Sequence, residues 1–182
     1  MIDTGSWEKF KVGDILECKT CPNSVKIDLN DGEIPYISRT ALNNGCDGFV
    51  NISSEKISKG NCITIGAEGI YAFYQNKEFA TGVKIYNLRN EHLNREVALF
   101  LCTILNLEIY RYNYGRARIL EKIKNELIKL PILLDDNNNP IIDDKKIYSQ
   151  EGYIPDWKFM ENYIKDLENK EKNNIKKIIG MI

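Results

Sequence analysis

The sequence has a single histidine, His92, among 182 residues, and this scarcity excludes several kinds of catalytic site. A Ser-His-Asp or Cys-His arrangement needs a histidine, and a zinc site needs several Cys or His ligands close together. The chain also lacks the glycine-rich loops that bind phosphates or dinucleotides and the H-E-x-x-H zinc motif. We therefore expect neither a catalytic constellation nor a metal site in this chain.

Long apolar runs are absent as well. No run of 18 apolar residues occurs, and Met1-Ile2-Asp3-Thr4 lacks the basic and apolar regions of a signal peptide. We expect a cytoplasmic protein that does not contact membranes. Lys and Arg number 25 against 26 Asp and Glu, so no overall positive field attracts nucleic acid. Any basic binding surface must be local.

Cysteines are few and scattered, at Cys18, Cys21, Cys46, Cys62 and Cys102. Cys18 and Cys21 form one C-x-x-C, but no second close pair of Cys or His follows it. An odd number of dispersed cysteines is typical of free thiols in a reducing compartment. We interpret them as inert, half-buried thiols rather than as a zinc or redox site.

The hydrophobic pattern predicts an α+β fold. The length suits one domain with an appendage, and 43% hydrophobic residues suffice for a core. From Phe10 to Phe49, extended runs at Val12–Ile15, Val25–Leu29 and Ile34–Ile37 alternate with turns such as Asn30-Asp31-Gly32. Further strands are predicted over residues 57–65, 70–74, 81–86 and 127–132, and helices over 94–105 and 119–123.

The C-terminal segment predicts a separate helix of about 22 residues, about 33 Å long. Asp156 is its N-cap candidate, and Glu171 interrupts its apolar stripe. The stripe comprises Trp157, Met160, Ile164, Leu167, Ile175 and Ile178. Such a helix is marginal alone, so either its own globular domain or another chain must cover the stripe.

Two polar breaks divide the chain. Residues 135–140 are acidic and rich in asparagine, and residues 149–152 form a second break. We therefore predict a globular domain over 1–134, a linker over 135–154 and a helical arm over 155–182.

Two short segments resemble enzyme motifs, but neither is expected to form a catalytic site. Pro155-Asp156 with Glu168-Asn169-Lys170 has the spacing of a metal-dependent nuclease motif. That motif needs its side chains on adjacent strands around a cation, whereas here they follow one predicted helix. Asn138-Asn139-Pro140-Ile141 falls short of the Asn-Pro-Pro-aromatic motif of adenine methyltransferases.

One segment is locally basic. The sequence from Ile109 to Lys129 contains six basic residues and only two acidic ones. Arginine bonds phosphates or guanine edges bidentately, and tyrosine adds a hydroxyl and a flat face. A phosphate-facing strip and an ordinary surface turn fit this composition equally well. The candidate contacts are Tyr110, Arg111, Tyr112, Tyr114, Arg116 and Arg118.

A second polar cluster follows the strand at Ile34–Ile37. It contains Ser38, Arg39, Thr40, Asn43 and Asn44. Asparagine can pair with adenine and hydroxyls can donate to phosphates, whereas Asn-Asn-Gly is also a strong turn signal. For Asn44 we favour the turn role, and Arg39 and Thr40 are the better candidates for contact.

Taken together, several segments resemble the target recognition domain of specificity subunits from type I restriction-modification systems and their BcgI-like relatives. No segment is specific alone, but their order and spacing match over about residues 7–132. A segment at Pro155–Ile164 also resembles the chain that precedes the conserved helix of such subunits. The matching segments are Trp7–Ile15, Ile34–Gly45, Gly69 with Phe73-Tyr74-Gln75, and Leu127–Pro131.

This resemblance implies a domain that reads one half of a bipartite target in double-stranded DNA. It adds Tyr74 to the DNA-contacting candidates, and it gives the helical arm a role in dimerisation or methyltransferase docking. The specificity subunit is not catalytic, since S-adenosylmethionine and magnesium belong to partner methyltransferase and restriction subunits. Family members carry two recognition domains and two arms, so this chain is similar to a half-subunit that could form a homodimer.

Two hypotheses of different classes follow. The leading one is a sequence-specific DNA-binding subunit that directs N6-adenine methyltransferase and restriction subunits. The alternative is a protein-interaction scaffold that docks a larger complex through its C-terminal helix without reading DNA. The alternative leaves the arginine and tyrosine segment unexplained.

Overall fold

The computed structural model describes residues 2–68, 71–113 and 115–180. Within them, helices and mainly antiparallel sheets confirm the predicted α+β class. The α-helices are α1 (Val12–Ile15), α2 (Arg95–Leu107), α3 (Leu120–Asn125) and α4 (Trp157–Ile179), and the short 3-10 helices are η1 (Lys26–Asp28), η2 (Asn43–Gly45), η3 (Ser54–Lys56) and η4 (Ile109–Arg111).

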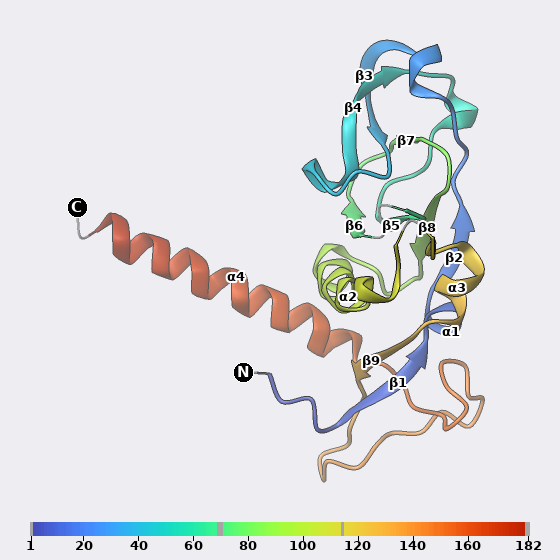
Figure 1. The fold of residues 1–182 in the computed structure, drawn as a ribbon. Coiled ribbons are helices and arrows are strands. Elements are labelled where there is room, and N and C mark those ends of the chain that lie inside the picture. Colours follow the sequence, from blue (N-terminus) through green and yellow to red (C-terminus); the bar gives the residue numbers. More distant parts are fainter. Residues whose placement is uncertain (1, 69–70, 114, 181–182) are drawn as a thin grey trace.

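The centre of the molecule is a four-stranded antiparallel sheet packed against α2 (Figure 1). Asn94 caps α2, since its side chain accepts a hydrogen bond from the Val97 amide at 2.9 Å. Apolar side chains of α2, including Leu101 and Leu105, are buried in the main core. The strand order is β2 (Glu17–Thr20), β8 (Ile85–Arg89), β5 (Cys62–Gly66) and β6 (Ala72–Gln75).

A smaller lobe lies at the top of Figure 1. It is a three-stranded sheet with its own core of Tyr36, Val50 and Ala80. β3 pairs antiparallel with β4 and parallel with β7. The strands are β3 (Asn30–Ile37), β4 (Cys46–Asn51) and β7 (Ala80–Thr81).

A two-stranded ribbon brings residues far apart in the chain together below the central sheet. β1 (Trp7–Lys11) pairs antiparallel with β9 (Leu127–Pro131). The chain then continues through residues 132–156, where the Leu133 amide bonds to the Ile154 carbonyl and the Asp156 amide to the Pro131 carbonyl. These bonds place the start of α4 at the end of β9.

Helix α4 confirms the predicted arm helix and its cap, because Asp156 accepts a hydrogen bond from the Phe159 amide at 2.8 Å. Its first turns pack against α2, and the rest projects away from the globular part (Figure 1). Met160 is 0% exposed in the main core, with Trp157 and Ile164 partly buried beside it. The chain's own domain therefore covers Met160, which is one of the two alternatives that the sequence left open and excludes Met160 as a partner contact in this conformation.

Several local predictions differ from the structure. Val12–Ile15 forms the helical turn α1 rather than extended chain, and Lys26–Asp28 is a 3-10 turn. The Asn30-Asp31-Gly32 turn lies inside β3, as part of an irregularity where the register shifts between Asp31 and Ile34. The strand predicted over 57–65 is confined to Cys62–Gly66, and that over 81–86 divides into β7 and β8.

The hairpin predicted between β5 and β6 is confirmed by the pairing of Ile65 with Ala72, although Gly69 lies outside the described residues. Across the described ranges, no helix is both long and apolar enough to span a membrane.

Candidate nucleic-acid interface

The first candidate surface is the loop that joins β3 to β4, here called the 38–45 loop. Asn43, Asn44 and Gly45 follow one another with φ angles of 49°, 57° and 78°, all in the left-handed region. Glycine and asparagine are the residues that adopt this region most readily. The Asn-Asn-Gly sequence therefore suits a left-handed turn at the tip of the loop, beside the exposed side chains of Leu42 and Asn43.

Two polar side chains, the exposed Asn44 and the buried Gln75, tie this turn to the central sheet. The Asn44 side-chain amide donates to the Tyr74 carbonyl at 2.8 Å, so Asn44 has the turn role that we favoured. The Gln75 side chain, 7% exposed, donates to the Asn44 carbonyl and to the Thr64 hydroxyl, both at 3.0 Å. Sequence reasoning gave Gln75 no role, because nothing in its local pattern reveals a partner 31 residues away.

The predicted contact residues of this loop differ in accessibility. Ser38 and Thr40 are half-buried, whereas Arg39 and Asn43 are exposed. Arg39 forms an ion pair with Glu68, which also holds Lys84 Nζ at 3.0 Å. A DNA phosphate or base would have to replace this carboxylate as the partner of Arg39.

Tyr74 lies beneath the loop on β6 and is only partly exposed. Its hydroxyl donates to Asn61 Oδ1 at 3.1 Å, and burial raises the pKa of this hydroxyl above its usual value. The side chain is thus a neutral, engaged group whose backbone carbonyl anchors Asn44.

The second candidate surface is the 109–118 loop, which connects α2 to α3. Tyr110 is 74% exposed, and the Arg111 guanidinium lies 5.5 Å from the centre of its ring. Arg111 also pairs with Glu108 at 2.7 Å. Arg111, Arg116 and Lys122 line a hollow of about 370 Å³, whose basic side chains suit a phosphate. Tyr114 lies outside the described residues.

Arg118 does not face solvent, so its prediction as a DNA contact is wrong. Its side chain is 0% exposed and pairs with the equally buried Glu126 at 2.7 Å. It also donates to the Leu105 carbonyl at 3.1 Å, and it lies 5.2 Å from the centre of the Tyr112 ring. A guanidinium so enclosed cannot reach a ligand in this conformation.

Tyr112 belongs to the same buried network. Its hydroxyl donates to Glu126 Oε2 at 3.0 Å. Burial, together with the negative charge of Glu126, raises the pKa of this tyrosine, so the hydroxyl stays protonated and keeps donating. Of the six arginines and tyrosines predicted in this segment, Tyr110, Arg111 and Arg116 are the ones that the structure exposes among those it describes.

Strand β6 links the two loops. Gln75 and Tyr74 hold the 38–45 loop at one end of the strand. At the other end, the Asn106 side chain accepts from the Ala72 amide at 2.7 Å and donates to its carbonyl at 3.1 Å. Asn106 lies in the last turn of α2, directly before the 109–118 loop, so one strand fixes the bases of both loops.

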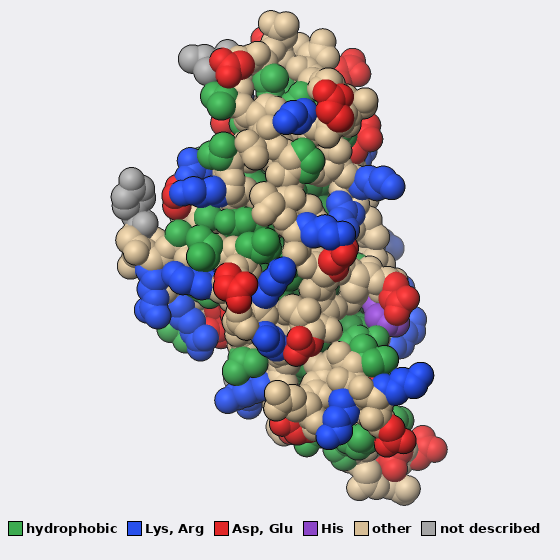
Figure 2. Space-filling view, turned by 90° about the vertical axis from the view of Figure 1, so that its right-hand side faces the viewer, with side chains coloured by type: hydrophobic (Ala, Val, Ile, Leu, Met, Phe, Trp, Pro, Cys, Tyr) green, Lys and Arg blue, Asp and Glu red, His purple; other side chains and the backbone are tan. Residues whose placement is uncertain are grey.

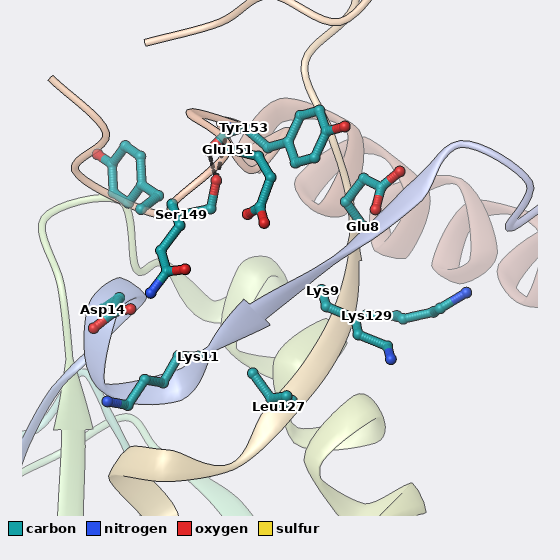
Figure 3. A pocket seen from close by; sticks show the side chains of 11 residues that line it. Glu8, Lys9, Lys11, Asp14, Leu127, Lys129, Ser149, Glu151 and Tyr153 are labelled. Carbon is teal, nitrogen blue, oxygen red and sulfur yellow. Dashed lines mark hydrogen bonds between the residues drawn. The ribbon is translucent and has the colours of Figure 1, made fainter. Parts of the chain in front are cut away.

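Lys and Arg side chains are spread over the face shown in Figure 2, with Asp and Glu among them. A second hollow shows that lysine alone does not define a site. This hollow of about 610 Å³ lies between the β1–β9 ribbon and residues 148–153 (Figure 3). Lys9 and Lys129 face each other directly across the ribbon. Its three lysines are matched by the carboxylates of Glu8, Asp14 and Glu151, so it has no net charge to attract DNA.

The cysteines lie mostly in the core. Burial raises the pKa of Cys18 to about 11 and those of Cys62 and Cys102 to about 12, so these thiols are protonated near neutral pH. A protonated thiol is a poor nucleophile and metal ligand, which supports the interpretation of inert thiols. Over residues 2–68, 71–113 and 115–180, no group of three His, Cys, Asp or Glu side chains is placed to hold a metal ion.

The arm residues fall into two groups. Trp157, Met160 and Ile164 pack into the main core of the chain itself. Leu167, Ile175 and Ile178 are exposed, and Ile178 retains 62% of its surface. The structure thus covers half of the predicted stripe and leaves the other half open.

Comparison with known proteins places this arrangement in a family. The chain is 28% identical over 169 residues to the specificity subunit S.BcgI of a type II restriction enzyme from Heyndrickxia coagulans, which covers 91% of this chain and 44% of that protein. This chain therefore spans less than half the length of that relative.

Solved structures share the fold at low sequence identity. A chain from a study of complex assembly in the type I R-M system matches with a TM-score of 0.60 and 13% identity, covering 93% of this chain and 40% of that chain. The HsdS subunit from Thermoanaerobacter tengcongensis matches with a TM-score of 0.57 and 12% identity, and the match covers 93% of this chain and 39% of that chain. The type I S subunit from M. genitalium matches with a TM-score of 0.57 and 13% identity, and the match covers 97% of this chain and 42% of that chain.

A family model matches residues 5–177, nearly the whole sequence and both candidate loops. The chain belongs to the type I restriction-modification DNA specificity domain family.

Proposed function

We propose that this chain is a half-sized specificity subunit that reads one half of a bipartite target in double-stranded DNA. The observation that carries the proposal is the family match over residues 5–177, which includes two exposed loops anchored on one strand. The contact candidates are Arg39 and Asn43 on the first loop and Tyr110, Arg111 and Arg116 on the second. The scaffold alternative gains no support from these comparisons.

In this proposal the chain has no chemistry of its own. Methyltransferase and restriction subunits supply N6-adenine methylation and cleavage, together with S-adenosylmethionine and magnesium. The exposed distal part of α4 joins a second copy or a methyltransferase subunit. A homodimer with antiparallel arms has two-fold symmetry, and its target is then an inverted repeat with a fixed gap.

A methylome of the source cell with and without the gene tests this function. We expect one bipartite N6-methyladenine motif to disappear when the gene is deleted and to return when it is restored. A methylome unchanged by deletion, in a cell whose methyltransferase partner is shown to be active, contradicts the proposal.

The role of the exposed arginines is tested through the salt dependence of DNA binding. Each of Arg111→Ala and Arg116→Ala should reduce the slope of log affinity against log salt by about 0.9, if each contacts one phosphate. Lys56→Ala, in the exposed 3-10 helix η3, is the control and should leave the slope unchanged. An unchanged slope in both arginine variants removes this surface from the interface.

A further inference from the structure

Arg118 stands apart from the other arginines of the 109–118 loop, because its side chain joins several elements instead of reaching solvent. Its backbone amide donates to the Ala67 carbonyl at 2.8 Å, just beyond β5. Its guanidinium bonds the Leu105 carbonyl of α2 and both carboxylate oxygens of Glu126, at 3.1 Å and 2.7 Å for the carboxylate. Glu126 in turn holds the Val12 amide through its carbonyl at 2.9 Å.

We propose that Arg118, with Glu126 and Tyr112, is a positioning group that sets the geometry of the 109–118 loop for DNA recognition without touching DNA. This proposal rests on the proposed function. The guanidinium bonds α2, where the loop begins, and a carboxylate between α3 and β9, just beyond where the loop ends. A planar fork with several donors fixes orientation more tightly than a single ammonium group does.

A contribution to stability does not by itself explain why a buried ion pair such as Arg118 and Glu126 is present. Burying two charges costs desolvation free energy, and apolar pairs of similar volume often replace buried ion pairs with neutral or stabilising effect. The Arg118 and Glu126 side chains are 0% and 1% exposed, so the cost of desolvating both charges applies to this pair. What an apolar pair lacks is the directional bonding that holds Tyr112 through its hydroxyl and its ring.

The orientation of Tyr112 matters because its neighbours are the exposed candidates. Arg111 precedes it directly, and Arg116 follows through a turn closed by the Arg116 amide and the Asn113 carbonyl at 2.9 Å. Arg111, Tyr112 and Arg116 line the same hollow. A Tyr112 released from Glu126 would let both arginines sample many positions, and ordering them again upon binding reduces affinity.

The test is the double variant Arg118→Met with Glu126→Leu in the full chain, because the single Arg118→Met variant leaves a buried charge without its partner. We expect thermal unfolding within a few degrees of the wild type, faster hydrogen exchange in residues 110–117, and a Kd for the selected DNA duplex raised about tenfold or more. Preference should relax at several base positions together. Arg118→Lys keeps the charge but loses the fork, and it should give a smaller loss of affinity.

The matched control is Arg95→Met with Glu168→Leu, which removes an exposed ion pair of similar length, 2.6 Å, between α2 and α4. It should leave both hydrogen exchange in the loop and DNA preference unchanged.

If the Arg118/Glu126 double variant selects the same duplex with the same Kd, the pair is purely structural and the proposal is overturned. Should the double variant fail to fold, Tyr112→Phe decides, because it removes one hydroxyl and must still relax preference. A wild-type chain that selects no duplex overturns the proposed function itself.

A different observation carries a second inference. The tip of the 38–45 loop places two consecutive non-glycine residues, Asn43 and Asn44, in the left-handed region, and such backbone conformations are concentrated at functional sites. The turn is held from below by Gln75 and Asn44, and it leaves Leu42 71% exposed beside Asn43. An exposed leucine on a rigid tip cannot serve phosphates, but it can contact a thymine methyl group or the step between two bases.

We infer that Leu42 and Asn43 form a reading tip that enters a DNA groove, with Gln75 as its positioning residue. This inference also depends on the proposed function. Asn43 can pair with an adenine edge, and Leu42 supplies the adjacent apolar contact. A turn that hydrogen bonds from Asn44 and Gln75 already hold before binding avoids the entropy loss of ordering the loop on DNA.

Selection of duplexes from a random library by Leu42→Ala and Asn43→Gly chains tests the tip. Asn43→Gly tolerates the left-handed backbone, so it removes the side chain without adding strain. Each variant should lose preference at one or two base positions while other positions keep theirs. Ile147→Ala, at another exposed apolar residue, is the control. Unchanged preference in both variants overturns the inference, and unchanged preference with lost methyltransferase assembly assigns the tip to a protein partner instead.

Discussion

The two halves of helix α4 share one sequence pattern but have opposite surroundings. In the docked half, residues 157–166, the Tyr163 ring meets the Phe100 ring of α2 edge to face at 5.9 Å, and Trp157 stacks on His92 at 5.1 Å. In the distal half, residues 167–179, Ile175 and Ile178 are exposed. The same apolar period thus completes the core of one domain and then leaves it.

This difference shows that a helical apolar stripe predicts burial without identifying the surface that covers it. Periodicity marks which face of the helix is apolar, but the length of the domain beneath it decides where docking stops. Here α2 provides the surface for the first turns, and the Arg95 and Glu168 pair marks the end of contact at 2.6 Å. Beyond it the stripe is available to another chain.

The largest effect on the free energy of unfolding is expected from a substitution in the docked half of α4. Met160→Ala removes a fully buried side chain, and large-to-small core substitutions of this kind destabilise by about 2–5 kcal/mol. Urea unfolding monitored by circular dichroism measures this change in the free energy of unfolding. Ile178→Ala, on the exposed face, is the matched variant and should change it by about 0.5 kcal/mol or less. Equal effects at the two positions would contradict the division of the helix.

The next effect concerns the distal half. Ile175→Glu with Ile178→Glu places charges on the open stripe, so it should abolish self-association or methyltransferase docking while leaving the unfolding free energy of the monomer unchanged. Sedimentation velocity over a range of concentrations, with and without the methyltransferase subunit, measures both assemblies. Assembly that survives this double substitution assigns the contact to another surface.

The smallest effect is expected at the border between the halves. Arg95→Ala removes an exposed ion pair, and such pairs contribute about 0.2–1 kcal/mol, decreasing as salt is raised. Chemical unfolding at low and high ionic strength should show a small difference from the wild type that disappears in salt. A loss that is large and insensitive to salt would show that the border is held by more than surface charge.

The sequence predicted the architecture well where patterns are long or capped. The α2 and α4 helices, with their Asn94 and Asp156 caps, and the strand β9 follow from periodicity and local hydrogen-bonding chemistry. The predictions for short elements such as α1 were wrong, because four residues carry too little periodicity to distinguish a helical turn from a strand.

The candidate site was predicted by region and not by individual role. Composition identified the two loops, but it treated Arg111, Arg116 and Arg118 alike. Only the fold reveals that Arg118 meets Glu126 in the core, since that pairing depends on how α3 and β9 follow the loop. The anchoring role of Gln75 was not predicted for the same reason, because its partner Asn44 is distant in the sequence.

Selection of duplexes from a random library with the purified full chain decides whether this chain reads a DNA sequence. We expect enrichment of a short motif, present as an inverted repeat with a fixed gap if two copies bind through their arms. Enriched DNA should bind the Arg116→Ala chain more weakly and with a shallower salt dependence. A library that shows no enrichment over its starting composition, with or without the methyltransferase subunit, would show that the chain does not read DNA.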